Sequence, residues 1–304
     1  MSDIPTISAS PLPDLRVVAR SNPDVFTLLV NAWDTDSRAL GMDAFDAVCH
    51  RVSNLLTNPA SVEGSAGLLT PAQEKLLDQY VKYVPDVTAD LLAPVEAELG
   101  NSGLRNFIDT LYIVDQATRL DITHRRLFDV DAIQSSVLDS PWELKKTSPS
   151  RANVLYHDAI AAKKTILPQI DRELVRLRAG DYHHCEYCRS IRIELDGAPV
   201  VSRDLESRIA NYEESDLTPG QKAALAYADA HMQEPTRVDR ALRDRLRENY
   251  TTEEIIQITL EVSCWNYQKL LVALALAPRA NDEYITLVSI DDQGVIHHGE
   301  LLNY

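Results

Sequence analysis

The sequence predicts an all-α protein with two tandem helical units, the first of them degenerate, and a small β-hairpin at the C-terminus. Alanine, leucine, glutamate, aspartate and arginine dominate the composition, which favours helices. Only 10 glycines and 6% aromatic residues argue against a β-sandwich with many turns. The 304 residues suffice for roughly two domains of about 150 residues each. One helix-start motif also occurs in both halves of the chain.

The repeated motif is a capped helix start. Residues 69–73 read LTPAQ and residues 217–221 read LTPGQ. In each copy the threonine suits the N-cap, the proline suits the first helical position, and the glutamine closes a capping box at the third. Apolar residues follow at helical spacing, including Leu76 and Leu77 in the first copy and Leu225 in the second. Both segments are therefore predicted to be helices.

A second helix start follows each motif at a similar interval. In the second half it is the capping box of residues 251–254, and in the first half it is Ser102 with Gly103. Two such coincidences favour a duplicated helical unit. The alternative is that two capped helices simply recur in a helical protein.

These signals divide the chain into a degenerate first unit (1–145), a second unit (146–280) and a tail (281–304). Turn-forming residues cluster at 138–150, where the units are expected to meet. The helices expected in the second unit cover residues 152–164, 168–179, 181–195, 203–212, 218–232, 238–248 and 252–276.

The tail differs in character from the rest of the chain. Residues 284–290 are apolar and rich in β-branched side chains, residues 291–294 have the composition of a turn, and residues 295–296 are again β-branched. This pattern predicts the C-terminal hairpin.

The chain is acidic, since 46 aspartates and glutamates against 30 lysines and arginines give a formal net charge of -16. This balance disfavours nucleic acid and anionic membranes as partners. No apolar run reaches the roughly 18 residues of a membrane helix, and the N-terminus lacks the regions of a secretory signal. With four cysteines and no signal, we expect a cytoplasmic protein that is not a disulfide scaffold.

The most distinctive chemistry lies in Cys185 and Cys188, which form a C-x-x-C motif. Gly180 is expected to end one helix and Asp181 to cap the next, which places Cys185 near a helix N-terminus. The partial positive charge of that terminus favours a thiolate. One helical turn separates the two cysteines, so their sulfurs can approach bonding distance.

Redox chemistry is the leading interpretation of this motif. Arg189 and Arg192 follow on the same face, and nearby arginines lower a thiol pKa. A zinc site is the alternative, although the second half of a two-part zinc motif is missing from the sequence. His184 with the two cysteines would supply three ligands, so the alternative stays open, but we expect no metal. Cys49 and Cys264 are isolated and are expected to be buried apolar residues.

The segment 168–178 and the C-x-x-C motif resemble the carboxymuconolactone decarboxylase and alkylhydroperoxidase AhpD-like superfamily. Its redox members carry a glutamate twelve residues before the first cysteine, where this chain has Glu173 before Cys185. The family histidine, four residues after the second cysteine, is replaced here by Arg192. The resemblance covers residues 153–277. The first unit has no C-x-x-C and resembles the family only through the repeated helix starts.

The resemblance implies a thiol-dependent oxidoreductase, either a peroxidase or a disulfide reductase. Cys188 would be the attacking thiolate and Cys185 the resolving partner, although these roles could be exchanged. Glu173 would accept and relay the proton. An arginine at the family histidine position stays protonated, so His184, with His183, is the nearest candidate for a further base.

The remaining implications concern ligands and assembly. Arg192 and Arg189 are candidates for binding an anionic substrate group, and Tyr187 for a hydrogen bond to the substrate. No nucleotide fingerprint is present, so we expect no cofactor, and an external thiol reductant must reopen the disulfide. The substrate would be a small peroxide or disulfide, and the resemblance implies a homo-oligomer.

Two other functions remain open from the sequence. Superfamily members without redox thiols act as lyases, for example in lactone decarboxylation, and the two arginines would suit a carboxylate substrate. Because the family histidine is missing, a third function also remains open, in which the protein is not an enzyme but binds a metal or a partner.

Overall fold

The computed structural model describes residues 12–61, 63–139, 147–161, 166–281, 283–291 and 296–302. Within these ranges the chain is mostly helical, as predicted, but "all-α" is too narrow because four strands form a sheet. No helix in the described part is both long enough and apolar enough to span a membrane.

The α-helices are α1 (Arg16–Ser21), α2 (Pro23–Leu40), α3 (Met42–Thr57), α4 (Pro71–Lys82), α5 (Ala89–Leu127), α6 (Pro149–Ala161), α7 (Gln169–Tyr182), α8 (Glu186–Arg189), α9 (Arg203–Glu206), α10 (Pro219–Gln233), α11 (Arg240–Asn249), α12 (Thr252–Trp265) and α13 (Tyr267–Ala273).

Short 3-10 segments and strands complete the described chain. The 3-10 segments lie between helices and are η1 (Pro59–Ser61), η2 (Val84–Asp86), η3 (Val130–Ala132), η4 (Ser135–Asp139), η5 (Tyr212–Glu214) and η6 (Pro235–Arg237). The strands are β1 (Ile191–Leu195), β2 (Ala198–Pro199), β3 (Ile285–Ile290) and β4 (Ile296–Leu302).

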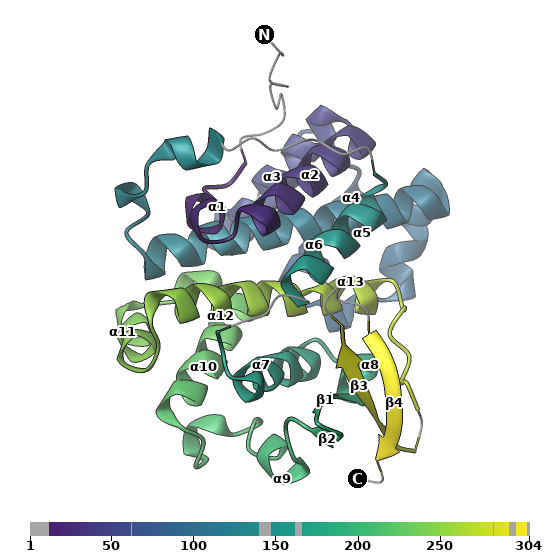
Figure 1. The fold of residues 1–304 in the computed structure, drawn as a ribbon. Helices are drawn as coiled ribbons and strands as arrows, with labels where there is room; N and C mark the ends of the chain where they lie inside the picture. The colour runs from purple at the N-terminus through teal and green to yellow at the C-terminus, as the bar shows by residue number, and fades with distance from the viewer. Residues whose placement is uncertain are drawn as a thin grey trace.

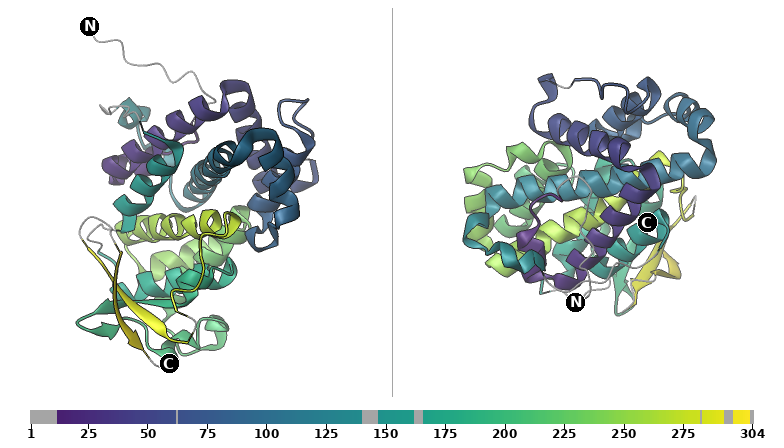
Figure 2. Two further views of the ribbon diagram at one scale, coloured as in Figure 1. Left: turned by 90° about the vertical axis from the view of Figure 1, so that its right-hand side faces the viewer. Right: turned by 90° about the horizontal axis from the view of Figure 1, so that it is seen from above.

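The molecule has an upper and a lower part in the view of Figure 1. Helices α1 to α6 form the upper part, and α7 to α11 with the sheet form the lower part. Helix α12 runs between them and packs against α6 on one side and α7 on the other. Figure 2 shows the same arrangement from two further directions. One hydrophobic core runs through both parts, from Leu15 and Trp33 to Trp265 and Leu270.

Two series of elements follow the same order in the two halves of the chain. The first is α4, η2 and α5, and the second is α10, η6, α11 and α12. Helix α5 corresponds to two helices because Gly100, with a φ of 72°, interrupts it. The predicted capping boxes at Thr70, Thr218 and Thr251 are all present. The predicted start at Ser102 lies just after the interruption at Gly100, inside α5.

The helix predicted for residues 181–195 is wrong. Helix α7 ends at Tyr182, α8 is a single turn, and the chain then enters β1. In β1, Ile191 and Ile193 alternate with charged residues, which suits a strand. Strand β1 pairs in parallel with β3, which is distant in sequence, and this pairing makes the segment a strand.

The predicted C-terminal hairpin is confirmed, and it belongs to a larger sheet. Strands β3 and β4 pair antiparallel, and the full strand order is β2-β1-β3-β4. Residues 292–294 of the turn predicted at 291–294 lie outside the described residues, as do residues 140–146 of the predicted seam between the units.

A buried ionic cluster joins the two parts. Asp115 on α5 accepts hydrogen bonds from Lys269 Nζ at 2.7 Å and from Arg119 Nε at 2.8 Å. Arg119 also donates to the carbonyl oxygens of His231 and Val81. Burial alone would raise the pKa of Asp115, but the two cations outweigh it and lower that pKa. Burial lowers the pKa of Lys269 to about 8, with Asp115 acting in the opposite direction.

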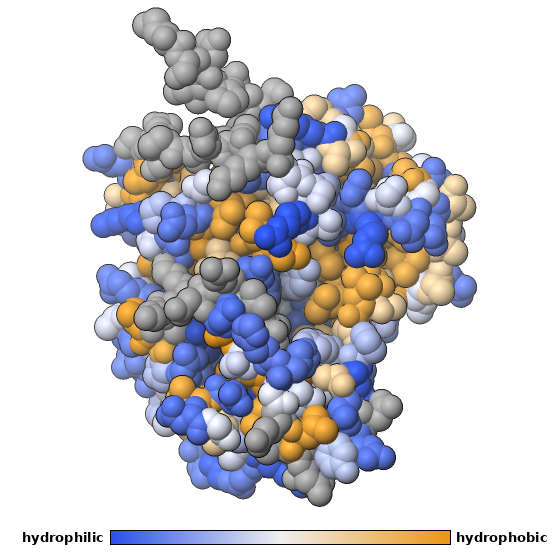
Figure 3. All heavy atoms as spheres, turned by 45° about the vertical axis from the view of Figure 1, so that its right-hand side comes forward, coloured by the Kyte–Doolittle hydropathy of each residue, from blue (hydrophilic) through white to orange (hydrophobic). Residues whose placement is uncertain are grey.

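Apolar surface gathers over the upper part of the molecule. Figure 3 shows this apolar surface most clearly at the upper right of the view. Leu68, just before α4, and Leu99 on α5 are exposed apolar residues of this part.

We expect Asp115→Asn to lower the free energy of unfolding by about 3–5 kcal/mol, because it leaves two buried cations without a counter-charge. Urea unfolding at neutral pH measures this loss. Asp244→Asn is the control, since Asp244 pairs with Arg240 at the surface, where such pairs contribute about 0–1 kcal/mol. Similar losses in the two variants would contradict this account of the cluster.

Candidate redox site

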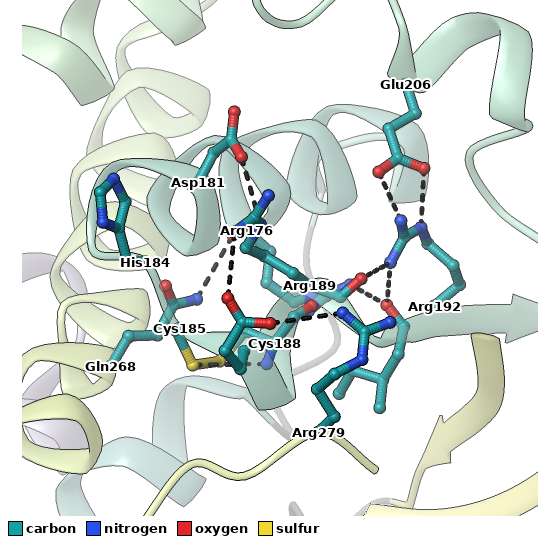
Figure 4. Close-up of polar contacts among 12 residues, drawn as sticks. Arg176, Asp181, His184, Cys185, Cys188, Arg189, Arg192, Glu206, Gln268 and Arg279 are labelled. Atoms are coloured by element: carbon teal, nitrogen blue, oxygen red, sulfur yellow. Dashed lines mark hydrogen bonds and ion pairs between the residues drawn. A yellow bond between two sulfur atoms is a disulfide. The ribbon is translucent and has the colours of Figure 1, made fainter. Parts of the chain in front are cut away.

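The two cysteines of the C-x-x-C motif form a disulfide, with their Cα atoms 5.3 Å apart (Figure 4). The sulfurs thus lie at bonding distance, as their spacing predicts. Cys185 is the N-cap of α8, and its sulfur accepts the backbone N–H of Cys188 at 3.3 Å. Both side chains are buried, with exposed fractions of 0% for Cys185 and 5% for Cys188.

The turn that carries the disulfide differs from the one predicted. Gly180 lies inside α7 rather than ending it, and the residue in the left-handed region is His184, with a φ of 52°. Cys185 itself, rather than Asp181, caps the next helix. A Cβ on Gly180 would lie 3.3 Å from the Cys188 Cβ. The glycine therefore serves the close approach of α7 to the disulfide.

Glu173 and Arg176 form a buried ion pair on α7. Arg176 Nε and Nη2 donate to the two carboxylate oxygens at 2.6 and 2.7 Å. The carboxylate also accepts the backbone N–H of Ile193 at 3.1 Å. Arg176 donates further to the carbonyl oxygens of Cys188 at 2.8 Å and Ile191 at 2.9 Å. The pair therefore ties α7 to both α8 and β1.

Glu173 makes no hydrogen bond to either cysteine sulfur within the described part of the chain. Its carboxylate accepts three N–H groups from Arg176 and Ile193, and its connection to the disulfide turn runs through Arg176. The two hydrogen bonds from Arg176 are charge-assisted, which makes them stronger than neutral ones. Arg176 is not among the predicted site residues, although its spacing of three residues from Glu173 on a helix is a usable signal for an ion pair.

The two histidines before the motif have different surroundings. His183 is buried, with Nε2 2.8 Å from Asn266 Oδ1. Burial, aided by the charge of Lys269, lowers the pKa of His183 to about 3, so its ring is neutral at physiological pH. His184 is exposed, and its Nε2 lies 3.2 Å from the Tyr83 hydroxyl of the upper part.

A small apolar pocket of about 90 Å³ lies against Cys188. Arg176, Tyr187 and Gln268 bring polar groups to its wall. Gln268 Nε2 donates to the Arg176 carbonyl, whereas its Oε1 is buried without a hydrogen-bond partner in the described part of the chain. The rest of the lining comes from α6, β1, α12, α13 and β3, and consists of His157, Ile191, Ile193, Trp265, Tyr267, Leu271, Val288 and Ile290.

The predicted substrate-binding residues separate into two places. Tyr187 lines the apolar pocket, and its hydroxyl lies 3.3 Å from His298 Nε2. Arg192 and Arg189 line a different cavity. Arg192 is 2% exposed and pairs with Glu206 through both Nε and Nη2. Its Nη1 donates to the carbonyl oxygens of Arg189 and Ile191, so the side chain is fixed.

Cys49 and Cys264 lie outside the disulfide turn. Cys264 is buried, as predicted, and burial raises the pKa of its thiol, which makes it a poor nucleophile. Cys49 is only partly buried. Among the residues that the structure describes, no group of three or more His, Cys, Asp or Glu side chains is arranged to hold a metal ion.

Comparison with known proteins gives two partial relatives. These are uncharacterized proteins of Mycobacterium tuberculosis, from strains CDC 1551/Oshkosh and ATCC 25618/H37Rv, each 32% identical to this chain over 120 residues. The match covers 39% of this chain and 42% of each relative, so the chain spans less than half of their length. No protein-family model matches the chain, and no solved structure matches it at a significant level.

Proposed function

We propose that this chain is a thiol-dependent peroxidase that reduces small organic hydroperoxides through Cys185 and Cys188. The observation that carries the proposal is a bonded cysteine pair in which Cys188 also forms part of the wall of an apolar pocket. A disulfide that serves only stability needs no such pocket beside it. The resemblance of residues 153–277 to the AhpD-like superfamily supports the same function.

The proposed reaction uses both cysteines. In the dithiol form, the Cys188 thiolate attacks a peroxide oxygen and the O–O bond breaks. Cys188 becomes a sulfenic acid, and the alkoxide takes up the proton that the Cys188 thiol released, leaving as the alcohol. The Cys185 thiol then attacks the sulfenic sulfur, which forms the disulfide and releases water. An external dithiol supplies two electrons by thiol–disulfide exchange and restores both thiols.

The surroundings of the pair support these roles. Cys188 is the attacking residue because it contacts the pocket, whereas Cys185 is fully buried. Gln268 also lines the pocket and brings a polar side chain to its wall. Arg176 lines the same pocket, and its positive charge favours the Cys188 thiolate. Glu173 positions Arg176.

The remaining features of the proposal concern assembly. We infer that the two series of elements, α4–η2–α5 and α10–η6–α11–α12, are tandem AhpD-like units and that the first has lost its redox motif. The resemblance also implies a homo-oligomer. The apolar surface of the upper part is the candidate contact between copies.

The thiol count gives the first test. Denatured protein that has not been reduced should show two thiols, from Cys49 and Cys264, and reduction should raise the count to four. Cys188→Ser should abolish peroxide consumption, whereas Cys49→Ser should retain it. Peroxide turnover by Cys188→Ser, or a reduced protein whose thiol count does not fall on adding peroxide, would overturn the proposal.

The pocket gives a test of substrate class. Leu271 lines the pocket, so Leu271→Phe should reduce its volume. We expect kcat/KM for tert-butyl hydroperoxide to fall about tenfold and that for hydrogen peroxide to fall less than about twofold, because only the alkyl group needs the space. Leu276→Phe, at an exposed position that does not line the pocket, is the control. Equal losses for both peroxides would argue against substrate binding in this pocket.

Substitutions of Glu173 and Arg176 test the role of their ion pair, because they should shift the pKa of Cys188 in opposite directions. Arg176→Gln removes a cation near the thiols and should raise the pKa of Cys188 in the reduced protein, whereas Glu173→Gln leaves that cation unneutralised and should lower it. The ultraviolet absorbance of the thiolate, followed against pH, measures both changes. The double variant should lie close to the wild type.

A proton relay predicts a different result for the same variant. Glu173→Gln would then slow peroxide reduction on the order of 10²-fold without lowering the thiol pKa. Shifts in the same direction for both single variants would contradict the positioning role.

A further inference from the structure

A second cavity, of about 360 Å³, lies beside the disulfide turn and shares no lining residue with the apolar pocket. Asp181 and Glu206 are the acidic residues of its wall. Its arginines come from α8, β1, α9 and the segment before β3, and are Arg189, Arg192, Arg203 and Arg279. Figure 4 shows Arg189, Arg192 and Arg279 gathered in this region.

The charge of this cavity is opposite to that of the protein. Four guanidinium groups face two carboxylates in its wall, and Glu186, which pairs with Arg189 and Arg279 from outside the wall, adds a third. The arginines therefore remain in excess, whereas the whole chain has a formal net charge of -16. A local positive potential in a concave site raises the concentration of anions there, while the rest of an acidic surface repels them. The cavity therefore favours anionic ligands.

The arginines differ in how tightly they are held. Arg192 is fixed by Glu206 and by two carbonyl oxygens, so its charge forms a rigid part of the wall. Arg189 and Arg279 are 45% and 39% exposed and share the Glu186 carboxylate at 3.2 and 3.3 Å, and Arg189 Nε also lies 3.4 Å from Asp181 Oδ1. Exposed pairs of this kind contribute little to stability. These two side chains can therefore exchange their exposed carboxylate partners for a ligand at small cost.

We propose that this cavity binds a small organic acid through a carboxylate or phosphate group that Arg189 and Arg279 hold. Guanidinium groups bind both kinds of oxyanion in a bidentate manner. Leu177, Ile209 and Ile285 supply an apolar surface for the carbon skeleton of the ligand. The volume of about 360 Å³ lies at the small end of the roughly 300–1,000 Å³ of ligand pockets. The ligand is thus of metabolite size.

Calorimetric titration of the full chain tests this site. Citrate and inorganic phosphate are the probes, at an ionic strength held constant with sodium chloride. We expect saturable binding by the wild type and about tenfold or greater weakening in the double variant Arg189→Gln/Arg279→Gln. Arg240→Gln, which changes an exposed arginine on α11, should bind as the wild type does. Tighter binding of citrate would indicate a carboxylic acid as ligand, and tighter binding of phosphate a phosphate ester.

The result does not depend on the proposed redox reaction, because binding is measured without turnover. Absence of binding by the wild type at millimolar probe, or equal affinities for the wild type and the double variant, would overturn the proposal. If the double variant does not fold, Arg279→Gln alone carries the same expectation of weaker binding. Circular dichroism of each variant checks its fold.

Discussion

The buried Glu173–Arg176 pair is the interaction on which the site depends. One guanidinium contacts the Glu173 carboxylate and the carbonyl oxygens of Cys188 and Ile191, so α7, α8 and β1 meet at a single side chain. Removal of either charge would leave the other buried and unpaired, which costs about 3–5 kcal/mol. Because these contacts involve no sulfur atom, they hold the turn in place whether the cysteines are bonded or reduced.

Local signals explain what the sequence could predict. The capping boxes at Thr70, Thr218 and Thr251 depend on residues three positions apart, and each was identified correctly. The bonded pair of Cys185 and Cys188 likewise follows from a spacing within one helical turn. Such features need no information about distant parts of the chain, so sequence reasoning reaches them.

The errors arose where distant segments decide the conformation. Residues 191–195 directly follow the single turn of α8, and the sequence predicts that they continue that helix, but pairing with β3 makes them a strand. The strand in turn places the N–H of Ile193 on Glu173 and the carbonyl of Ile191 on Arg176. The spacing between Glu173 and Cys185 alone does not reveal these two contacts, because they depend on the strand.

The first half of the chain contributes to the site despite having no C-x-x-C motif. Asp115 neutralises Lys269 on α13, one residue after Gln268 of the apolar pocket. Tyr83 contacts His184 in the turn that leads to Cys185. Without α5, the Lys269 charge would be buried without a counter-charge, and α13 could not keep its present position beside Cys188. The first half therefore contributes packing and charge to the surroundings of the site without contributing a cysteine pair.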